Sequence, residues 1–210
     1  MTLTTWIAYF IATLIICISP GPGALSSMSA GLKYGFRAGM WNLAGLQLAI
    51  LVNVVLVWLG VGALLLASST AFEIVKYLGA GYLVWLGVQK FFERPVPVEE
   101  ISAKTTFADT TRWGLLKQGL FVNLTNPKGI LFLVAVLPQF IDPARPAAPQ
   151  YAIMGLTMVV VDVIVMMGYT GLASRLLRLL RDPSHIRWTN RGLGSLFVAA
   201  GGALALFKRS

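Results

Sequence analysis

Long apolar stretches dominate this chain, and its polar residues gather in a few short intervals between them. A helix needs about 20 mostly apolar residues to cross a bilayer. Six stretches meet that requirement, at about residues 6–27, 40–67, 72–92, 114–138, 151–173 and 192–207. The pattern predicts an all-α integral membrane protein with six transmembrane helices.

One long polar interval, residues 93–113, divides the six stretches into three and three. It predicts a first repeat over residues 1–92, a cytoplasmic linker over 93–113 and a second repeat over 114–210. Because each half has an odd number of spans, the two halves must be inserted in opposite directions. Similar residues recur between the halves at offsets of 107 and 115: Trp6 and Trp113, Pro20 and Pro127, Gly79 and Gly194, Gly87 and Gly202. Inverted repeats with broken helices at matching positions are typical of transporters.

The composition supports a membrane protein and excludes several other classes. Hydrophobic residues make up 57% of the chain and charged residues only 12%, against about a quarter charged in ordinary domains. This excludes disorder, which requires low hydrophobicity, and argues against a nucleic-acid binder despite the net charge of +9. The single cysteine, Cys17, excludes an internal disulfide and a multi-cysteine metal site.

The basic residues predict the orientation of the spans. Twelve of the 17 lysines and arginines fall in the intervals after spans one, three and five or at the adjoining ends of those spans. The positive-inside rule places these intervals in the cytoplasm and therefore both termini outside. Arg175, Arg178 and Arg181 could form a nucleic-acid patch, but their spacing next to a span fits contact with anionic lipid better.

Two of the predicted spans carry segments that cannot be continuous helix. Ser19-Pro20-Gly21-Pro22-Gly23 interrupts the first span, since each proline removes a backbone donor and clashes with the preceding turn. A helix restarting near Pro22 would present free N–H groups and a positive dipole end to a carboxylate. Asn123-Leu124-Thr125-Asn126-Pro127-Lys128 interrupts the fourth span. The alternative is a pair of structural kinks without a ligand, but two matching breaks beside a lysine favour a binding site.

Lys128 and Asp162 are ionisable residues at similar depth within predicted spans. A charge there costs at least about 2.5–3.5 kcal/mol, and mutual pairing would lower that cost. One interpretation is a permanent structural ion pair. The other is that Asp162 exchanges a proton or meets a substrate ammonium while Lys128 meets the carboxylate, and buried ionisable groups in membranes favour this functional interpretation. Tyr169 follows Asp162 by seven residues and shares roughly its helix face.

Two further features leave alternatives open. Gln47 is a polar residue on the second span, which serves either as a ligand or as an interhelical hydrogen bond. Gly31, Gly35 and Gly39 recur every four residues, which predicts a face for close helix approach. They equally suit a flexible bend at the cytoplasmic side. An exposed face of this kind would permit a homodimer.

Several of these motifs together resemble the LysE/RhtB amino-acid exporter family. They are Ser19-Pro20-Gly21-Pro22, Gly35 and Gly39, Asn126-Pro127-Lys128 and Pro138-Gln139-Phe140, and the match in order and spacing covers essentially the whole chain. The stretches Ala44–Gln47, Phe121–Lys128 and Val160–Asp162 are similar to its homoserine/homoserine lactone efflux branch. Gly23 and Val165 depart from the common pattern, which has Asn and Trp there. The resemblance implies export of small neutral amino acids (homoserine, its lactone, and threonine as a further candidate) across the bacterial inner membrane, driven by protons.

These observations lead to one working hypothesis and two alternatives. In the hypothesis, a zwitterion binds between the two breaks, at Ser19, Pro20, Gly21, Pro22, Gly23, Gln47, Asn123, Asn126, Pro127 and Lys128. Asp162 couples the proton, Tyr169 supports the site, and no metal or cofactor takes part. An intramembrane enzyme is disfavoured because the spans offer no histidine, no glutamate other than Glu73 at the edge of the third span, and no nucleophile–base set. A non-transporting scaffold or subunit of a larger complex is the remaining alternative, and it would need neither mid-membrane charges nor paired breaks.

Overall fold

A computed structural model describes residues 1–67, 69–93, 111–142, 144–173 and 183–206 of the 210-residue chain. This part of the chain contains seven α-helices, one 3-10 helix and no strand, which confirms the all-α prediction. In order they are α1 (Leu3–Ile18), α2 (Pro22–Ala67), α3 (Ser69–Phe92), α5 (Arg112–Leu124), α6 (Pro127–Ala135), η1 (Leu137–Phe140), α7 (Ala147–Gly171) and α9 (Pro183–Leu206). Most of the predicted linker and Arg175, Arg178 and Arg181 lie outside the described residues.

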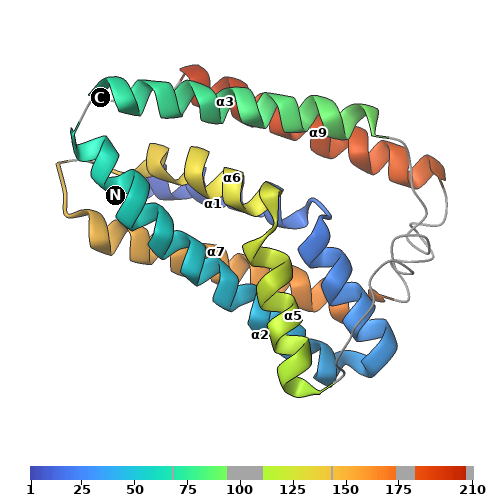
Figure 1. Cartoon of the computed structure of the whole chain (residues 1–210). Coiled ribbons are helices and arrows are strands. Elements are labelled where there is room, and N and C mark those ends of the chain that lie inside the picture. The colour runs from blue at the N-terminus through green and yellow to red at the C-terminus, as the bar shows by residue number, and fades with distance from the viewer. Residues whose placement is uncertain (68, 94–110, 143, 174–182, 207–210) are drawn as a thin grey trace.

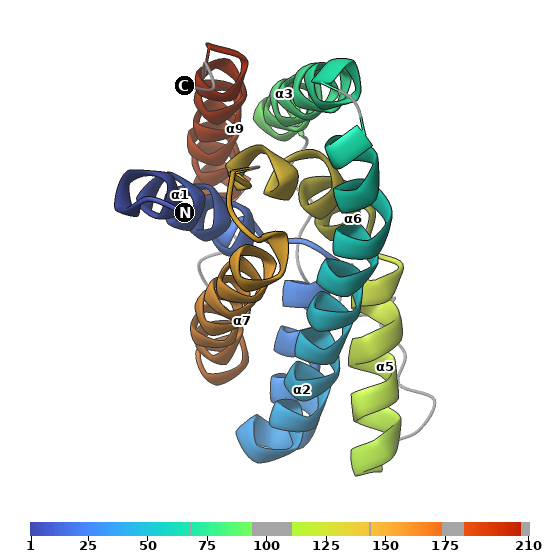
Figure 2. The same cartoon turned by 90° about the vertical axis from the view of Figure 1, so that its left-hand side faces the viewer.

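The helices run back and forth between two ends of the molecule (Figure 1). The N-terminus, the end of α2 and the starts of α3 and α7 lie at one end, here called the terminal end. The bend inside α2, the end of α3 and the start of α5 lie at the other, here called the linker end. Helices α3 and α9 lie side by side along one face, and α1 and α6 separate them from α2 and α7 (Figures 1 and 2).

The first predicted break falls where the prolines placed it. Helix α1 ends at Ile18, Ser19 has extended backbone angles, and α2 begins at Pro22. Proline is favoured in the first turn of a helix, where its missing N–H has no partner to lose. The chain therefore stops one helix and starts another within three residues.

Helix α2 is bent at Gly35 into a first arm, residues 22–34, and a second arm, residues 36–67. Gly35 has φ of 80° and ψ of 168°, which only glycine adopts without strain. The two arms fold back on each other (Figure 2), and Thr170 near the end of α7 lies against Gly31 of the first arm and Gly39 of the second. A Cβ on Gly31 or Gly39 would lie 2.9 or 2.6 Å from Thr170 Cγ2. Gly35 therefore forms a bend and the other two glycines permit close approach, while the cytoplasmic location of the bend stays a prediction.

The second predicted break separates α5 from α6, whose axes differ by 53°. Thr125 ends α5, and Asn126 has extended backbone angles. The Asn126 side-chain oxygen accepts a hydrogen bond from the Lys128 N–H at 3.2 Å, which caps the start of α6 at Pro127. A polar cap and an N-terminal proline thus start a new helix in the middle of a predicted span.

The prediction of six spans is not confirmed by the described residues, which show two or three. Among the described residues, Pro22–Gly60 and Ala147–Gly171 are long and apolar enough to cross a membrane, and the bent α5–α6 pair makes a third if it counts as one span. Helix α1 is apolar but has only 16 residues. Large apolar side chains are exposed on the outer faces of these helices, including Leu59, Leu156 and Ile164, each more than 60% exposed. Such surfaces are stable against lipid rather than water.

The terminal end is closed by close packing between α1, α6, η1 and α7. Tyr9, Phe132, Leu137 and Met154 are among the most deeply buried residues there. Tyr9 also donates a hydrogen bond from its hydroxyl to the Met154 carbonyl at 3.1 Å. This packing leaves the space around the two breaks separated from the terminal end.

Candidate functional site

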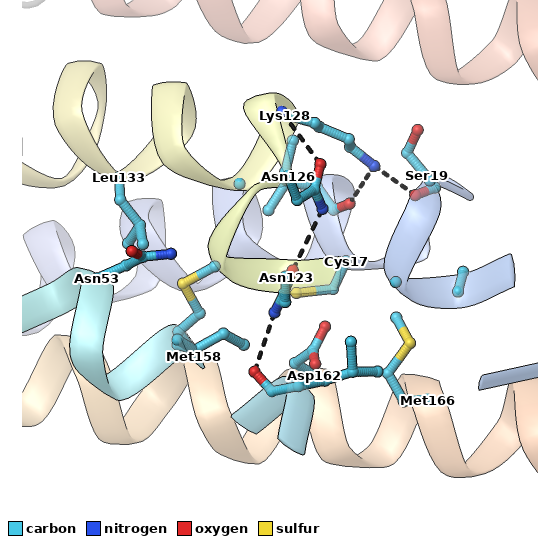
Figure 3. A pocket seen from close by; sticks show the side chains of 17 residues that line it. Cys17, Ser19, Asn53, Asn123, Asn126, Lys128, Leu133, Met158, Asp162 and Met166 are labelled. Atoms are coloured by element: carbon cyan, nitrogen blue, oxygen red, sulfur yellow. Dashed lines mark hydrogen bonds between the residues drawn. The ribbon is translucent and has the colours of Figure 1, made fainter. Parts of the chain in front are cut away.

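The two breaks face each other across a small cavity near the centre of the molecule, here called the central cavity (Figure 3). Helices α1, α2, α5, α6 and α7 all contribute to its wall. Its polar lining residues are Cys17, Ser19, Asn53, Asn123, Asn126, Lys128 and Asp162. The cavity measures about 50 Å³, which suits only a few water molecules at about 10–15 Å³ each.

Lys128 binds the end of α1. Its ammonium donates hydrogen bonds to the carbonyl oxygens of Ile16, at 2.9 Å, and of Ser19. The last carbonyls of a helix lack partners within the helix and carry its negative dipole end, so a cation stabilises them. Tyr169 acts on the same helix end, because its hydroxyl donates to the Ile18 carbonyl at 2.6 Å.

Asp162 lies on α7 at the opposite side of the central cavity and is 7% exposed. Gln47 of α2 donates a hydrogen bond from Nε2 to Asp162 Oδ2 at 2.7 Å. Gln47 is itself buried, and within the described part of the chain its Oε1 has no hydrogen-bond partner. A buried acceptor without a donor is costly, so Gln47 keeps this position for its contact with Asp162, the member of the pair that lines the cavity.

The direct ion pair that the sequence suggested between Lys128 and Asp162 is not formed. No nitrogen–oxygen distance between them is within 4.0 Å, whereas Lys90–Glu93 and Arg145–Asp142 do form ion pairs in the described residues. Figure 3 shows Lys128 and Asp162 on opposite sides of the cavity with Cys17 and Asn123 between them. Each charged group is instead held by neutral polar groups, the carbonyls of α1 and the amide of Gln47.

A chain of amides fixes the second break. Asn123 donates from Nδ2 to the Leu46 carbonyl at 3.0 Å, and Asn126 donates from Nδ2 to Asn123 Oδ1 at 3.2 Å (Figure 3). These bonds tie the end of α5 to the second arm of α2. Their geometry sets the start of α6 and thus the position of Lys128.

The structure brings most of the predicted site residues together. Of the residues named from sequence, those lining the central cavity are Ser19, Gly21, Gly23, Asn123, Asn126, Lys128 and Asp162. Pro20, Pro22 and Pro127 line a second, larger cavity beside it, here called the side cavity. Gln47 and Tyr169 line neither cavity and act through Asp162 and α1 respectively.

Sequence reasoning assigned no role in the site to Cys17 or Asn53, and both line the central cavity. Asn53 had a signal, because it is an amide within an otherwise apolar predicted span. Cys17 had no such signal in the sequence, because a lone thiol inside a hydrophobic stretch resembles any other core residue.

These observations define a class of protein. It is a membrane-embedded helical protein with two broken helices around a buried carboxylate and ammonium. Residues 14–207 match the profile of the family described as "LysE type translocator". The chain belongs to this family.

Several bacterial proteins are similar to the chain over nearly its full length. An uncharacterized membrane protein of Vibrio cholerae is 42% identical over 99% of this chain and 100% of its own length. The homoserine/homoserine lactone efflux protein of Salmonella typhimurium is 41% identical over 98% of both chains. The leucine efflux protein of an Enterobacter species is 32% identical over 94% of this chain and 93% of its own. No solved structure matches the chain significantly.

Proposed function

We propose that this protein exports small neutral amino acids in exchange for protons, with homoserine and homoserine lactone as its main substrates. The observation that carries the proposal is the placement of Asp162 and Lys128 on opposite sides of one cavity between two half-helix ends. The named activities of the Salmonella and Enterobacter relatives support amino-acid export.

The chemistry of the site fits an α-amino acid. The ammonium group meets the Asp162 carboxylate, which the Gln47 amide holds in place. The carboxylate meets Lys128 and the free N–H groups in the first turn of α2, which starts at Pro22. Homoserine lactone keeps the ammonium but has an ester in place of the carboxylate, so Asp162, positioned by Gln47, is the contact that both substrates share.

Exchange of substrate for protons follows if Asp162 holds either a proton or a substrate ammonium, but not both. A proton arriving from outside displaces the outgoing substrate, and its loss to the cytoplasm prepares the carboxylate for the next one. Exclusive binding of two ligands at one group makes the two flows depend on each other.

We further propose six spans in two inverted repeats, residues 1–92 and 114–210, joined by the cytoplasmic linker 93–113, with both termini outside. In this scheme the broken spans are α1 with the first arm of α2, and α5 with α6. Reciprocal packing supports it, since α1 packs on α7 as α5 packs on the second arm of α2. Helices α3 and α9 meet symmetrically: a Cβ on Gly87 would lie 2.6 Å from the Gly194 oxygen, and the reverse distance is also 2.6 Å. Rocking of the halves around the central cavity would give alternating access.

Reconstitution of the purified protein into vesicles tests the proposal. Vesicles loaded with labelled homoserine should release it faster than protein-free vesicles and faster still when the outside is acidified, and a protonophore should remove the effect of acidification. Absence of any protein-dependent release would contradict export and favour the scaffold alternative. Anionic lipids at the cytoplasmic side and a homodimer remain proposals that varied lipid mixtures and crosslinking would test.

A further inference from the structure

The side cavity is much larger than the central cavity and lies directly next to it. It measures about 460 Å³ between the first arm of α2, α3, α6 and α9. Ligand sites in proteins typically measure about 300–1,000 Å³, whereas the central cavity measures only about 50 Å³. In this conformation, the space that can already hold an amino acid is therefore the side cavity.

Lys128 stands between the two cavities. Ser19, Gly21 and Lys128 line both of them. The aliphatic part of Lys128 fills the space beside Gly21, where a Cβ would lie 3.3 Å from Lys128 Cδ. The ammonium of Lys128 is held away by the carbonyls of α1. If the Lys128 ammonium left these carbonyls for another partner, a passage would open from the side cavity to the central cavity.

The lining of the side cavity has the chemistry of a zwitterion with an apolar side chain. Lys90 and Glu93 form an ion pair in and just after the last turn of α3, so one positive and one negative group lie side by side. An amino acid carries a carboxylate and an ammonium on one carbon atom. Its carboxylate can pair with the Lys90 ammonium and its ammonium with the Glu93 carboxylate. Leu86, Leu131 and Phe197 line the apolar part of the wall. That part suits a leucine-like side chain through apolar burial.

The side cavity lies on the side from which an exported substrate would come. Lys90 and Glu93 are at the linker end, where α3 ends (Figure 1). The opposite, terminal end is closed by the packing around Tyr9 and Met154. If the linker end faces the cytoplasm, as the basic residues predict, the side cavity precedes the central cavity on the route outward.

We propose that the side cavity is a second binding site, which takes an amino acid as a zwitterion before it passes Lys128 into the central cavity. The inference rests on the proposed function. The carboxylate of the bound molecule pairs with Lys90 and its ammonium with Glu93. Further movement brings the carboxylate to Lys128 and draws that side chain away from the carbonyls of Ile16 and Ser19.

Transport kinetics in vesicles test the site, with homoserine and leucine as the probes. Lys90→Gln and Glu93→Gln should each raise KM by about fivefold, as expected for a contact between partly exposed charges. The maximal rate should stay unchanged, because the lost contact is made before the central site is reached. Arg145→Gln is the matched control, since it breaks an ion pair of the same spacing far from the side cavity. The reversed pair, Lys90→Glu with Glu93→Lys, should restore a KM close to that of the unaltered protein.

Binding to a transport-deficient variant separates this inference from the proposed function. Calorimetry on purified Asp162→Asn protein should still detect leucine binding, and Leu86→Trp in the same background should abolish it by filling the side cavity. Leucine binding that is absent in Asp162→Asn, or unaffected by Leu86→Trp, would overturn the second site while leaving export intact. An unchanged KM in both single charge variants would also overturn the second site. The side cavity would then be occupied by a lipid chain against its apolar walls. Failure of the unaltered protein to transport would instead contradict the proposed function.

Discussion

The ammonium of Lys128 in α6 binds the carbonyl oxygen of Ile16 in the last turn of α1 at 2.9 Å, although 112 positions separate them in the chain. This contact links the two breaks directly. Lys128 therefore has two roles in the account, as the cation that stabilises the end of α1 and as the partner of a substrate carboxylate. The two roles predict different consequences when the ammonium is removed.

Lys128→Met should impair homoserine export more than homoserine lactone export, because only homoserine carries a carboxylate. Gln47→Leu is the comparison, since it alters the ammonium contact that the two substrates share and should impair both equally. Competing efflux of the two labelled substrates from the same vesicles measures the ratio. Equal losses in Lys128→Met would contradict the assignment of Lys128 to the carboxylate.

Lys128→Met should also lower stability. The carbonyls of Ile16 and Ser19 lose hydrogen bonds from a charged donor, which contribute about 1.5–3 kcal/mol each in typical cases. The unfolding midpoint of the detergent-solubilised protein should therefore fall. A midpoint equal to that of the unaltered protein would show that the end of α1 does not depend on Lys128.

Much of this arrangement followed from local sequence, and the rest required the fold. Proline and glycine act on the backbone of their own residues, so Pro20, Pro22 and Pro127 sufficed to predict where the helices break. The partners of Lys128 were not predictable, because backbone carbonyls carry no residue-type signal. Charge reasoning suggested Asp162 as its partner, but a helix end that lacked hydrogen-bond donors was available nearer.

Gly35→Ala should destabilise the protein because the bend in α2 uses a backbone conformation that is essentially restricted to glycine. The expected cost is about 1–3 kcal/mol, the range for strained backbone positions. Gly60→Ala in the same helix is the control, since a Cβ there meets nothing within 4 Å and alanine favours helix by about 1 kcal/mol. Thermal unfolding in detergent compares the two, and similar midpoints would contradict the role given to the bend.

Cys17 provides a built-in probe of the central cavity because it is the only cysteine in the chain and lines that cavity. A small membrane-permeant thiol reagent should modify it slowly, since it is 5% exposed, and should block export. Saturating homoserine should slow the modification by occupying the same space. Cys17→Ser should transport and resist the reagent, whereas a labelling rate that homoserine leaves unchanged would place the substrate elsewhere.

Proton coupling at Asp162 is the central claim, and proton movement during export tests it most directly. Vesicles containing the unaltered protein or Asp162→Asn are loaded with homoserine and a trapped pH-sensitive dye, and then diluted into homoserine-free buffer. The unaltered protein should acidify the interior as homoserine leaves, and Asp162→Asn, present in the membrane in equal amount, should show neither proton uptake nor pH-driven efflux. Efflux and acidification at the unaltered rate in Asp162→Asn would contradict the account.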